Sequence, residues 1–112
     1  MEEKIFRCLV QHCVSPSSMS WLPLPSRYIV KTMGITFCEC MKHLHSLKDK
    51  GLIEVVRGGY YDDWSGQNRL YCGWYVTDKA KETEIYKQED EAVHNFMREK
   101  EKEWEKEIEN ER

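Results

Sequence analysis

Two cysteines and two histidines gather in one short stretch of the chain, between Cys38 and His45. Thiolates and imidazoles are the ligands that zinc prefers, so this stretch could hold a metal ion or carry redox chemistry. Residues two apart on a helix point about 200° from each other, so Cys38 and Cys40 cannot both face one ion. Cys38 and His45 share a face, but two ligands do not make a structural zinc site. The spacing therefore predicts no metal site, and it leaves Cys40 for the core.

No motif in the chain points to catalysis. We find no glycine-rich phosphate loop, no His-Glu-x-x-His sequence, and no Ser or Cys nucleophile beside a base along the chain. We therefore expect neither an enzyme nor a bound cofactor.

Composition and cysteine usage indicate a cytoplasmic protein without a membrane segment. No run of the 112 residues reaches the about 18 apolar residues of a membrane helix, and the N-terminus lacks the features of a signal peptide. The cysteines are odd in number and irregular in spacing, which indicates reduced thiols. These five residues are Cys8, Cys13, Cys38, Cys40 and Cys72.

The net charge of −3 divides unevenly along the chain. Residues 1 to 81 carry 11 Lys and Arg against 8 Asp and Glu, whereas residues 82 to 112 carry 6 against 12. A mildly basic head joined to an acidic tail indicates two separate tasks. We divide the chain into a domain over residues 1 to 80 and an acidic helix over residues 81 to 112.

The elements that position the functional residues begin with a helix over residues 2 to 13. Its apolar residues recur at helical spacing: they are Ile5, Phe6, Leu9, Val10 and Cys13. A connector rich in proline and serine follows over residues 14 to 25, and we expect Trp21, Leu22 and Leu24 to fix it to the core.

A short second helix is predicted to begin at Ser26, as its cap, and to continue to about Met33. Tyr28 to Val30 should supply its buried side. Gly34 ends this helix, because glycine readily adopts the left-handed conformation that helix ends require.

The third helix is predicted by a capping box, in which Thr36 and Glu39 each satisfy an amide at the helix start. Gly51 stops the helix. One face carries its apolar side chains, which are Cys40 or Met41, Leu44 and Leu47. A three-residue turn thus joins two helices, which is the layout of a helix-turn-helix.

Two strands are predicted after the third helix, over residues 52 to 57 and 69 to 76, because both segments are rich in β-branched or aromatic residues. The strands could also extend until only residues 62 to 67 form a loop. Alternation puts Cys72, Trp74 and Val76 on one face of the hairpin and Tyr71 and Tyr75 on the other. One set is core, and the other either packs on the chain itself or binds a partner.

The C-terminal segment has the composition of one long helix. It carries a sparse heptad stripe, made of Tyr86, Val93, Met97, Trp104 and Ile108. This stripe predicts a homodimer through the C-terminal helix. The alternatives are a helix that folds back on its own head, and a helix that frays after Trp104.

Three fragments stand in a familiar order: Met-Gly-Ile-Thr at 33 to 36, Leu-His-Ser-Leu-Lys-Asp-Lys-Gly-Leu-Ile-Glu at 44 to 54, and Gly-Trp-Tyr-Val-Thr-Asp-Lys-Ala-Lys-Glu-Thr at 73 to 83. Together they resemble bacterial and phage winged helix-turn-helix regulators, with the MarR-like and PadR-like groups as the nearest comparison. The resemblance implies an α+β, mostly helical fold with three helices, a hairpin wing and a long C-terminal helix. It further implies a recognition helix at about 36 to 50 in the major groove of duplex DNA, and a wing at about 52 to 76 on the backbone.

The residues expected to face DNA come from both helices and from the hairpin. Thr36 and Lys42 would contact phosphates, and Glu39 could accept a hydrogen bond from cytosine. Two features differ from what a tightly DNA-binding surface would show. The third helix begins with the apolar Phe37, and the carboxylates of Asp62 and Asp63 at the tip of the hairpin would repel phosphate. The full set of expected contacts is Arg27, Lys31, Thr36, Cys38, Glu39, Lys42, His43, Ser46, Arg57 and Arg69.

The sequence thus predicts a transcriptional regulator that binds duplex DNA as a dimer, with half-sites about one helical turn apart. One alternative is a winged-helix module that binds another protein through its aromatic hairpin. A second is a phage replication or packaging factor that binds DNA without repressing transcription. A third reading of the polar face of the third helix is an ordinary solvated surface.

Overall fold

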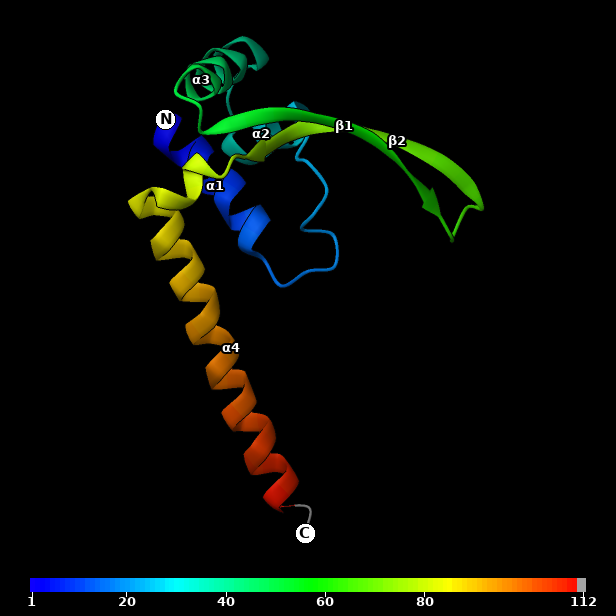
Figure 1. Cartoon of the computed structure of the whole chain (residues 1–112), viewed down its shortest axis with the longest axis vertical. Coiled ribbons are helices and arrows are strands. Elements are labelled where there is room, and N and C mark those ends of the chain that lie inside the picture. Colours follow the sequence, from blue (N-terminus) through cyan, green and yellow to red (C-terminus); the bar gives the residue numbers. More distant parts are fainter. Residues whose placement is uncertain (111–112) are drawn as a thin grey trace.

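The computed structural model describes residues 1 to 110 and has an α+β fold of four α-helices and one antiparallel hairpin (Figure 1). This confirms the predicted α+β class and the long C-terminal helix. The last two residues of the predicted tail, 111 and 112, lie outside the described residues. None of the helices within residues 1 to 110 combines the length and apolar character that a membrane crossing needs. In chain order the elements are α1 (Glu2–Val14), α2 (Ser26–Met33), α3 (Phe37–Asp49), β1 (Ile53–Asp62), β2 (Gln67–Val76), the 3-10 turn η1 (Lys79–Glu82) and α4 (Glu84–Asn110).

One core joins the first three helices to the base of the hairpin. The apolar face of α1 is buried as the helical spacing predicts, and so is the predicted face of α3. Trp74 and Val76 close the core from the sheet side, with 5% and 6% of their surface exposed. The fully or almost fully buried side chains from the helices are Ile5, Phe6, Leu9, Val10, Ile29, Cys40, Leu44 and Leu47.

Local chemistry fixes the turn between α2 and α3. Gly34 has a φ of 66°, in the left-handed region, and its amide donates to the carbonyl of Val30. Thr36 Oγ1 accepts a hydrogen bond from the amide of Glu39 at 3.2 Å. The predicted glycine end and the Thr36 half of the capping box are therefore confirmed, and α3 starts directly after a short turn.

Two predictions for α2 are wrong. Ser26 is the first residue of the helix rather than its cap, which is Pro25, and Ser26 Oγ instead accepts a hydrogen bond from Trp74 Nε1 at 2.9 Å. This bond satisfies an indole that the core buries. Tyr28 is 52% exposed, whereas Ile29 is fully buried. Val30 is half-buried against the core, so the prediction fails at Tyr28, because three consecutive helical residues span about 200° and cannot all face one side.

The hairpin is long, with ten residues in each strand and a register that runs from Ile53 opposite Val76 to Asp62 opposite Gln67. The alternative in which only the tip forms a loop is thus confirmed. The strands alternate between two faces. The face that carries Trp74 is called the α3 face, because the ring of His45 from α3 packs edge-on against Trp74 at 5.9 Å. The opposite side, which carries Tyr60 and Tyr71, is called the connector face.

The connector between α1 and α2 contacts both the hairpin and the core. Trp21 is 48% exposed and packs edge-on against Tyr60 and Tyr71, at 5.9 and 5.7 Å between ring centroids. Leu24 is buried, and its backbone exchanges two 2.9 Å hydrogen bonds with Trp74. In Figure 1 the connector loops below the hairpin as it arches away from the helices. The prediction that this segment is fixed to the core is therefore right for Leu24 and wrong for Trp21.

Gly73 lies where the connector backbone crosses β2. A Cβ atom at Gly73 would stand 2.7 Å from the carbonyl oxygen of Leu24, so the backbone bridge would have to move. We expect Gly73→Ala to lower the free energy of unfolding by about 1 to 3 kcal/mol, as measured by urea denaturation. Gly59→Ala is the matched control, because its new methyl would meet its nearest atom at an ordinary 3.4 Å. Equal losses in the two variants would contradict the close approach at Gly73.

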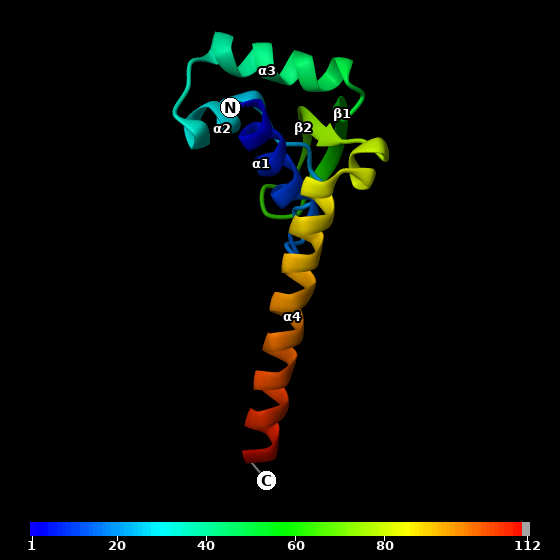
Figure 2. The same ribbon diagram turned by 90° about the vertical axis from the view of Figure 1, so that its left-hand side faces the viewer.

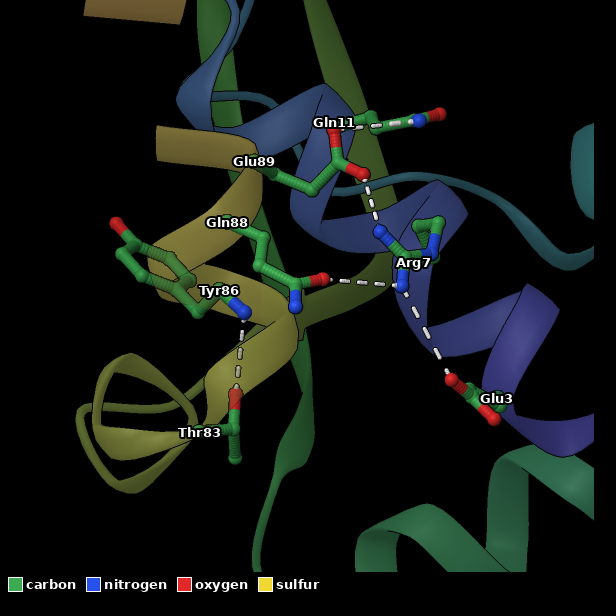
Figure 3. Close-up of polar contacts among 7 residues, drawn as sticks. All are labelled: Glu3, Arg7, Gln11, Thr83, Tyr86, Gln88 and Glu89. Atoms are coloured by element: carbon green, nitrogen blue, oxygen red, sulfur yellow. Dashed lines mark hydrogen bonds and ion pairs between the residues drawn. The ribbon is translucent and has the colours of Figure 1, made fainter. Parts of the chain in front are cut away.

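The start of α4 is anchored to α1 by polar contacts (Figure 3). Thr83 Oγ1 accepts from the amide of Tyr86 at 3.3 Å and caps the helix. Arg7 on α1 donates to Glu89 at 2.6 Å and to the side-chain oxygen of Gln88 at 3.5 Å. Because Arg7 and Glu89 are both partly shielded from water, this pair orients α4 better than a fully exposed pair would.

Beyond this anchor α4 leaves the head of the protein, as the two views in Figures 1 and 2 show. Its 27 residues correspond to about 40 Å of helix. The alternative in which the tail folds back along its own head is therefore wrong. Fraying after Trp104 is not observed either, because the helix continues to Asn110.

Candidate nucleic-acid interface

The outer side of α3 presents four of the six residues around this helix that were predicted to face DNA. Thr36, Cys38, Glu39 and Lys42 are all exposed, as expected. Cys38 and Lys42 lie opposite the buried line of Cys40, Leu44 and Leu47, so the core fixes their direction, while Thr36 is the N-cap of the helix. The side chains of His45 and Lys48 are exposed on the same helix and were missed by the sequence analysis. The distance of His45 from the buried line on the helix could have indicated it, whereas Lys48 follows Leu44 by four residues and lies close to that line.

His43 and Ser46 do not belong to this outer side, which corrects the prediction. Both are half-buried, and they lie beside Glu2 at the start of α1. The pKa of Glu2 is lowered mainly by its hydrogen bond with Lys50, and further by the Ser46 hydroxyl. The contact between the start of α1 and α3 joins residues more than 40 positions apart, so helical periodicity alone could not reveal it.

Arg69 is also misplaced by the prediction. It lies on the connector face of the hairpin, where its Nε donates to Asp62 Oδ2 at 2.7 Å. Asp62 accepts further hydrogen bonds from the amide of Trp64 at 3.0 Å and from Ser65 Oγ at 3.1 Å. Arg69 therefore already pairs with a tip carboxylate through Nε, and a phosphate contact would have to use its other donors or compete with Asp62. Asp62, in turn, is less repulsive to DNA than the sequence indicated.

Arg57 lies on the α3 face, across a cleft from α3. The cleft has a volume of about 300 Å³, and Lys48 and His45 line it from the helix while Arg57 and Val55 line it from β1. It continues outward into a hollow of about 530 Å³ beside Leu70, which Arg57 also lines. No acidic residue is among those that line either space in the described chain. The corner between α3 and the hairpin is therefore cationic and partly apolar.

Five cations on the two helices and the hairpin take part in no ion pair within residues 1 to 110. They come from α2, α3 and β1, and are Arg27, Lys31, Lys42, Lys48 and Arg57. All five are exposed. Their ammonium and guanidinium groups can therefore reach an anionic partner without first breaking a salt bridge.

Cys38 and Cys40 point to different environments, as the spacing predicts. Cys38 is exposed and Cys40 is fully buried, where burial raises the pKa of its thiol. All five cysteines are free thiols. Within residues 1 to 110, no three His, Cys, Asp or Glu side chains gather closely enough to hold a metal ion.

The predicted stripe on α4 lies along one side of the projecting helix. Tyr86, Val93 and Met97 are half-buried, whereas Trp104 and Ile108 are 56% and 55% exposed. Phe96 is also exposed, beside this stripe, and the ammonium of Lys100 lies 5.7 Å from its ring centroid. The heptad count missed Phe96. The distal part of the stripe thus faces water in a single chain.

Comparison with known proteins gave no match to this chain, whether against family models, curated proteins or solved structures. The resemblance to winged helix-turn-helix regulators therefore stays a prediction. The case for a function comes from the geometry of α2, α3 and the hairpin.

Proposed function

We propose that this chain is a winged helix-turn-helix protein that binds duplex DNA, with α3 in the major groove and the hairpin as its wing. The observation that carries the proposal is the acid-free cleft between α3 and the hairpin, with Lys48 on one wall and Arg57 on the other. The order of α1, α2, a tight turn, α3 and a hairpin supports it. A cytoplasmic regulator of transcription in a bacterium or phage is the role that fits this arrangement best.

The size of α3 suits the groove. A helix with its side chains is about 10 to 12 Å across, and the major groove of B-DNA is about 12 Å wide. Lys42, Lys48, Cys38 and His45 are all exposed, and we assign the two lysines to phosphates on the groove walls and Cys38 and His45 to the base edges. Five phosphate contacts from one copy give modest affinity, so two copies are needed for tight binding.

The second copy is proposed to join through α4. Trp104 and Ile108 lie half-exposed on a helix that leaves the head, and a second α4 would cover them. Two heads held in this way would bind half-sites about one helical turn apart.

The salt dependence of DNA binding tests this function. Each of five phosphate contacts releases counterions, so log K should fall against log salt with a slope of about −4 to −5 for one head. Between 50 and 200 mM salt this corresponds to a loss of affinity on the order of several hundredfold. The measurement is a mobility shift with random duplex DNA over this range. Undetectable binding at 50 mM salt, or a slope of log K against log salt near zero, would contradict the proposal that this protein binds DNA.

One observation favours a second candidate, a module that binds another protein through the hairpin. Trp64 at the tip is fully exposed, and exposed Asp63 lies next to it. Aromatic side chains of this kind often anchor protein interfaces. This reading gains support only if duplex DNA does not bind.

A further inference from the structure

One aliphatic side chain stands alone on the α3 face of the outer hairpin. Leu70 is 92% exposed, and its partner across the ladder is Gly59, which has no side chain. Gly58 precedes Gly59 in β1, and the side chain of Tyr71 lies over Gly58 on the connector face. Nothing in the described chain shields Leu70 from water, and burial of an exposed leucine is favourable only against a partner.

Charges are sorted between the two faces of the hairpin. On the α3 face, Arg57 is the single charged residue of either strand, and Asn68 lies beyond Leu70. The carboxylates of Glu54 and Asp62 both belong to the connector face. The face that carries Leu70 thus offers a cation and an amide and no anion along its strands.

We propose that Leu70 is an apolar wedge that enters the minor groove of duplex DNA and kinks it; this inference rests on the proposed function. Proteins that bind the minor groove use Arg and Asn to read its width and its A·T content, and they insert apolar side chains between base steps. Leu70 and Asn68 supply the apolar part and the amide on one face, and Arg57 adds its positive charge beside them while it contacts a phosphate. A polyanion is the occupant that an acid-free, cationic face favours.

The reach of the hairpin agrees with this placement. α3 meets the hairpin at Trp74, and Leu70 lies four residues farther along β2, about 13 Å away. Asn68 lies six residues away, at about 20 Å. Half a helical turn of B-DNA is about 17 Å, which is the axial distance from a major-groove site to the next minor groove. With α3 in the major groove, Leu70 and Asn68 therefore bracket the adjacent minor groove.

Trp64 is less suited to this role than Leu70, although it is more exposed. It stands in the tip loop directly after Asp63, whose exposed carboxylate would be carried toward the phosphates with it. Leu70 lies on β2, and the pairing of β2 with β1 holds its backbone in place. A wedge has to be held rigidly to unstack a base step.

The test measures DNA bending with the full chain. The probe is a duplex of about four helical turns with a fluorescent donor and acceptor at its two ends, and energy transfer reports its end-to-end distance. We expect the wild-type chain to bend this duplex by about 20 to 90°. Leu70→Ala should bind about tenfold more weakly and leave the duplex close to straight, whereas Leu70→Met should preserve the bend. Gln67→Ala, an exposed change on the connector face, is the matched control and should bend DNA like the wild type.

A preference for base steps gives a second readout. A kinking protein favours flexible TA and CA/TG steps, so the wild-type chain should prefer them at the wedge position and Leu70→Ala should not. If Leu70→Ala binds and bends DNA as the wild type does, or if the wild-type complex is straight, the wedge is wrong and the proposed function stands. If the wild-type chain does not bind duplex DNA at low salt, the wedge and the proposed function both fail.

Discussion

Replacing Lys42 and Arg57 together by alanine is expected to weaken duplex binding on the order of 100-fold at physiological salt. Lys42 projects from the outer side of α3, and Arg57 faces the same corner from β1. Each loss removes one phosphate contact per head, so the slope of log K against log salt should become shallower by about two. Both side chains are exposed, so their removal should leave the fold unchanged. Fluorescence anisotropy with a labelled duplex measures both quantities.

A matched control separates local contacts from overall charge. Lys102→Ala with Lys106→Ala removes the same two positive charges from the distal part of α4, away from the head. We expect this variant to bind within about threefold of the wild type, because exposed charges beyond a Debye length are screened. Equal losses in the two double variants would mean that DNA responds only to net charge, and α3 would lose its assigned role.

The sequence predicted the parts of the fold that local chemistry determines. Gly34 and Thr36 act on atoms within four residues of themselves, so their effect on the α2–α3 turn could be inferred without a structure. The buried line of α3 likewise follows from the helical period. These features place Cys38 and Lys42 on the outside of α3, so the exposure of these two candidate residues was predicted correctly.

The errors come from contacts between residues distant in the sequence. Ser26 was predicted to cap α2 because serine favours the N-cap position. In the structure its hydroxyl instead accepts a hydrogen bond from the indole of Trp74, which is 48 residues away in the sequence. Arg69 was assigned to DNA because the strand register was unknown, and the register places it beside Asp62. A polar side chain has several local uses, and only the tertiary structure decides among them.

The aromatic residues of the hairpin show the same limit. Alternation separated Trp74 from Tyr71 correctly, but it could not tell which face belongs to the core. In the structure Trp74 packs in the core, whereas Tyr71 packs against Trp21 of the connector. Since Trp21 of the connector packs on Tyr60 and Tyr71, the α3 face of the outer hairpin is the more open of the two faces.

Disrupting the α4 stripe is expected to convert a dimer into a monomer. Met97→Glu with Trp104→Glu places two carboxylates at the centre of the proposed interface, on a helix that already carries ten Asp and Glu against five Lys and Arg. Burying these charges without partners would cost several kcal/mol, more than a short helical pair can supply. Light scattering should show the mass of one chain. Affinity for a duplex with two half-sites should fall about 100-fold or more, because the second head no longer binds as part of the same complex.

The control for this variant changes charge equally on the other side of α4. Asn95→Glu with Lys106→Gln also adds two negative units, and each site lies two residues from its counterpart, about 200° around the helix. This variant should remain a dimer, and a chain truncated after Gln88 should be a monomer whose head keeps its α3 and hairpin intact. A wild-type chain that scatters as a monomer, or a truncated chain that remains a dimer, would contradict assembly through α4. The first result would require a single head to bind DNA alone, and the salt slope of about −4 to −5 would then describe the whole complex.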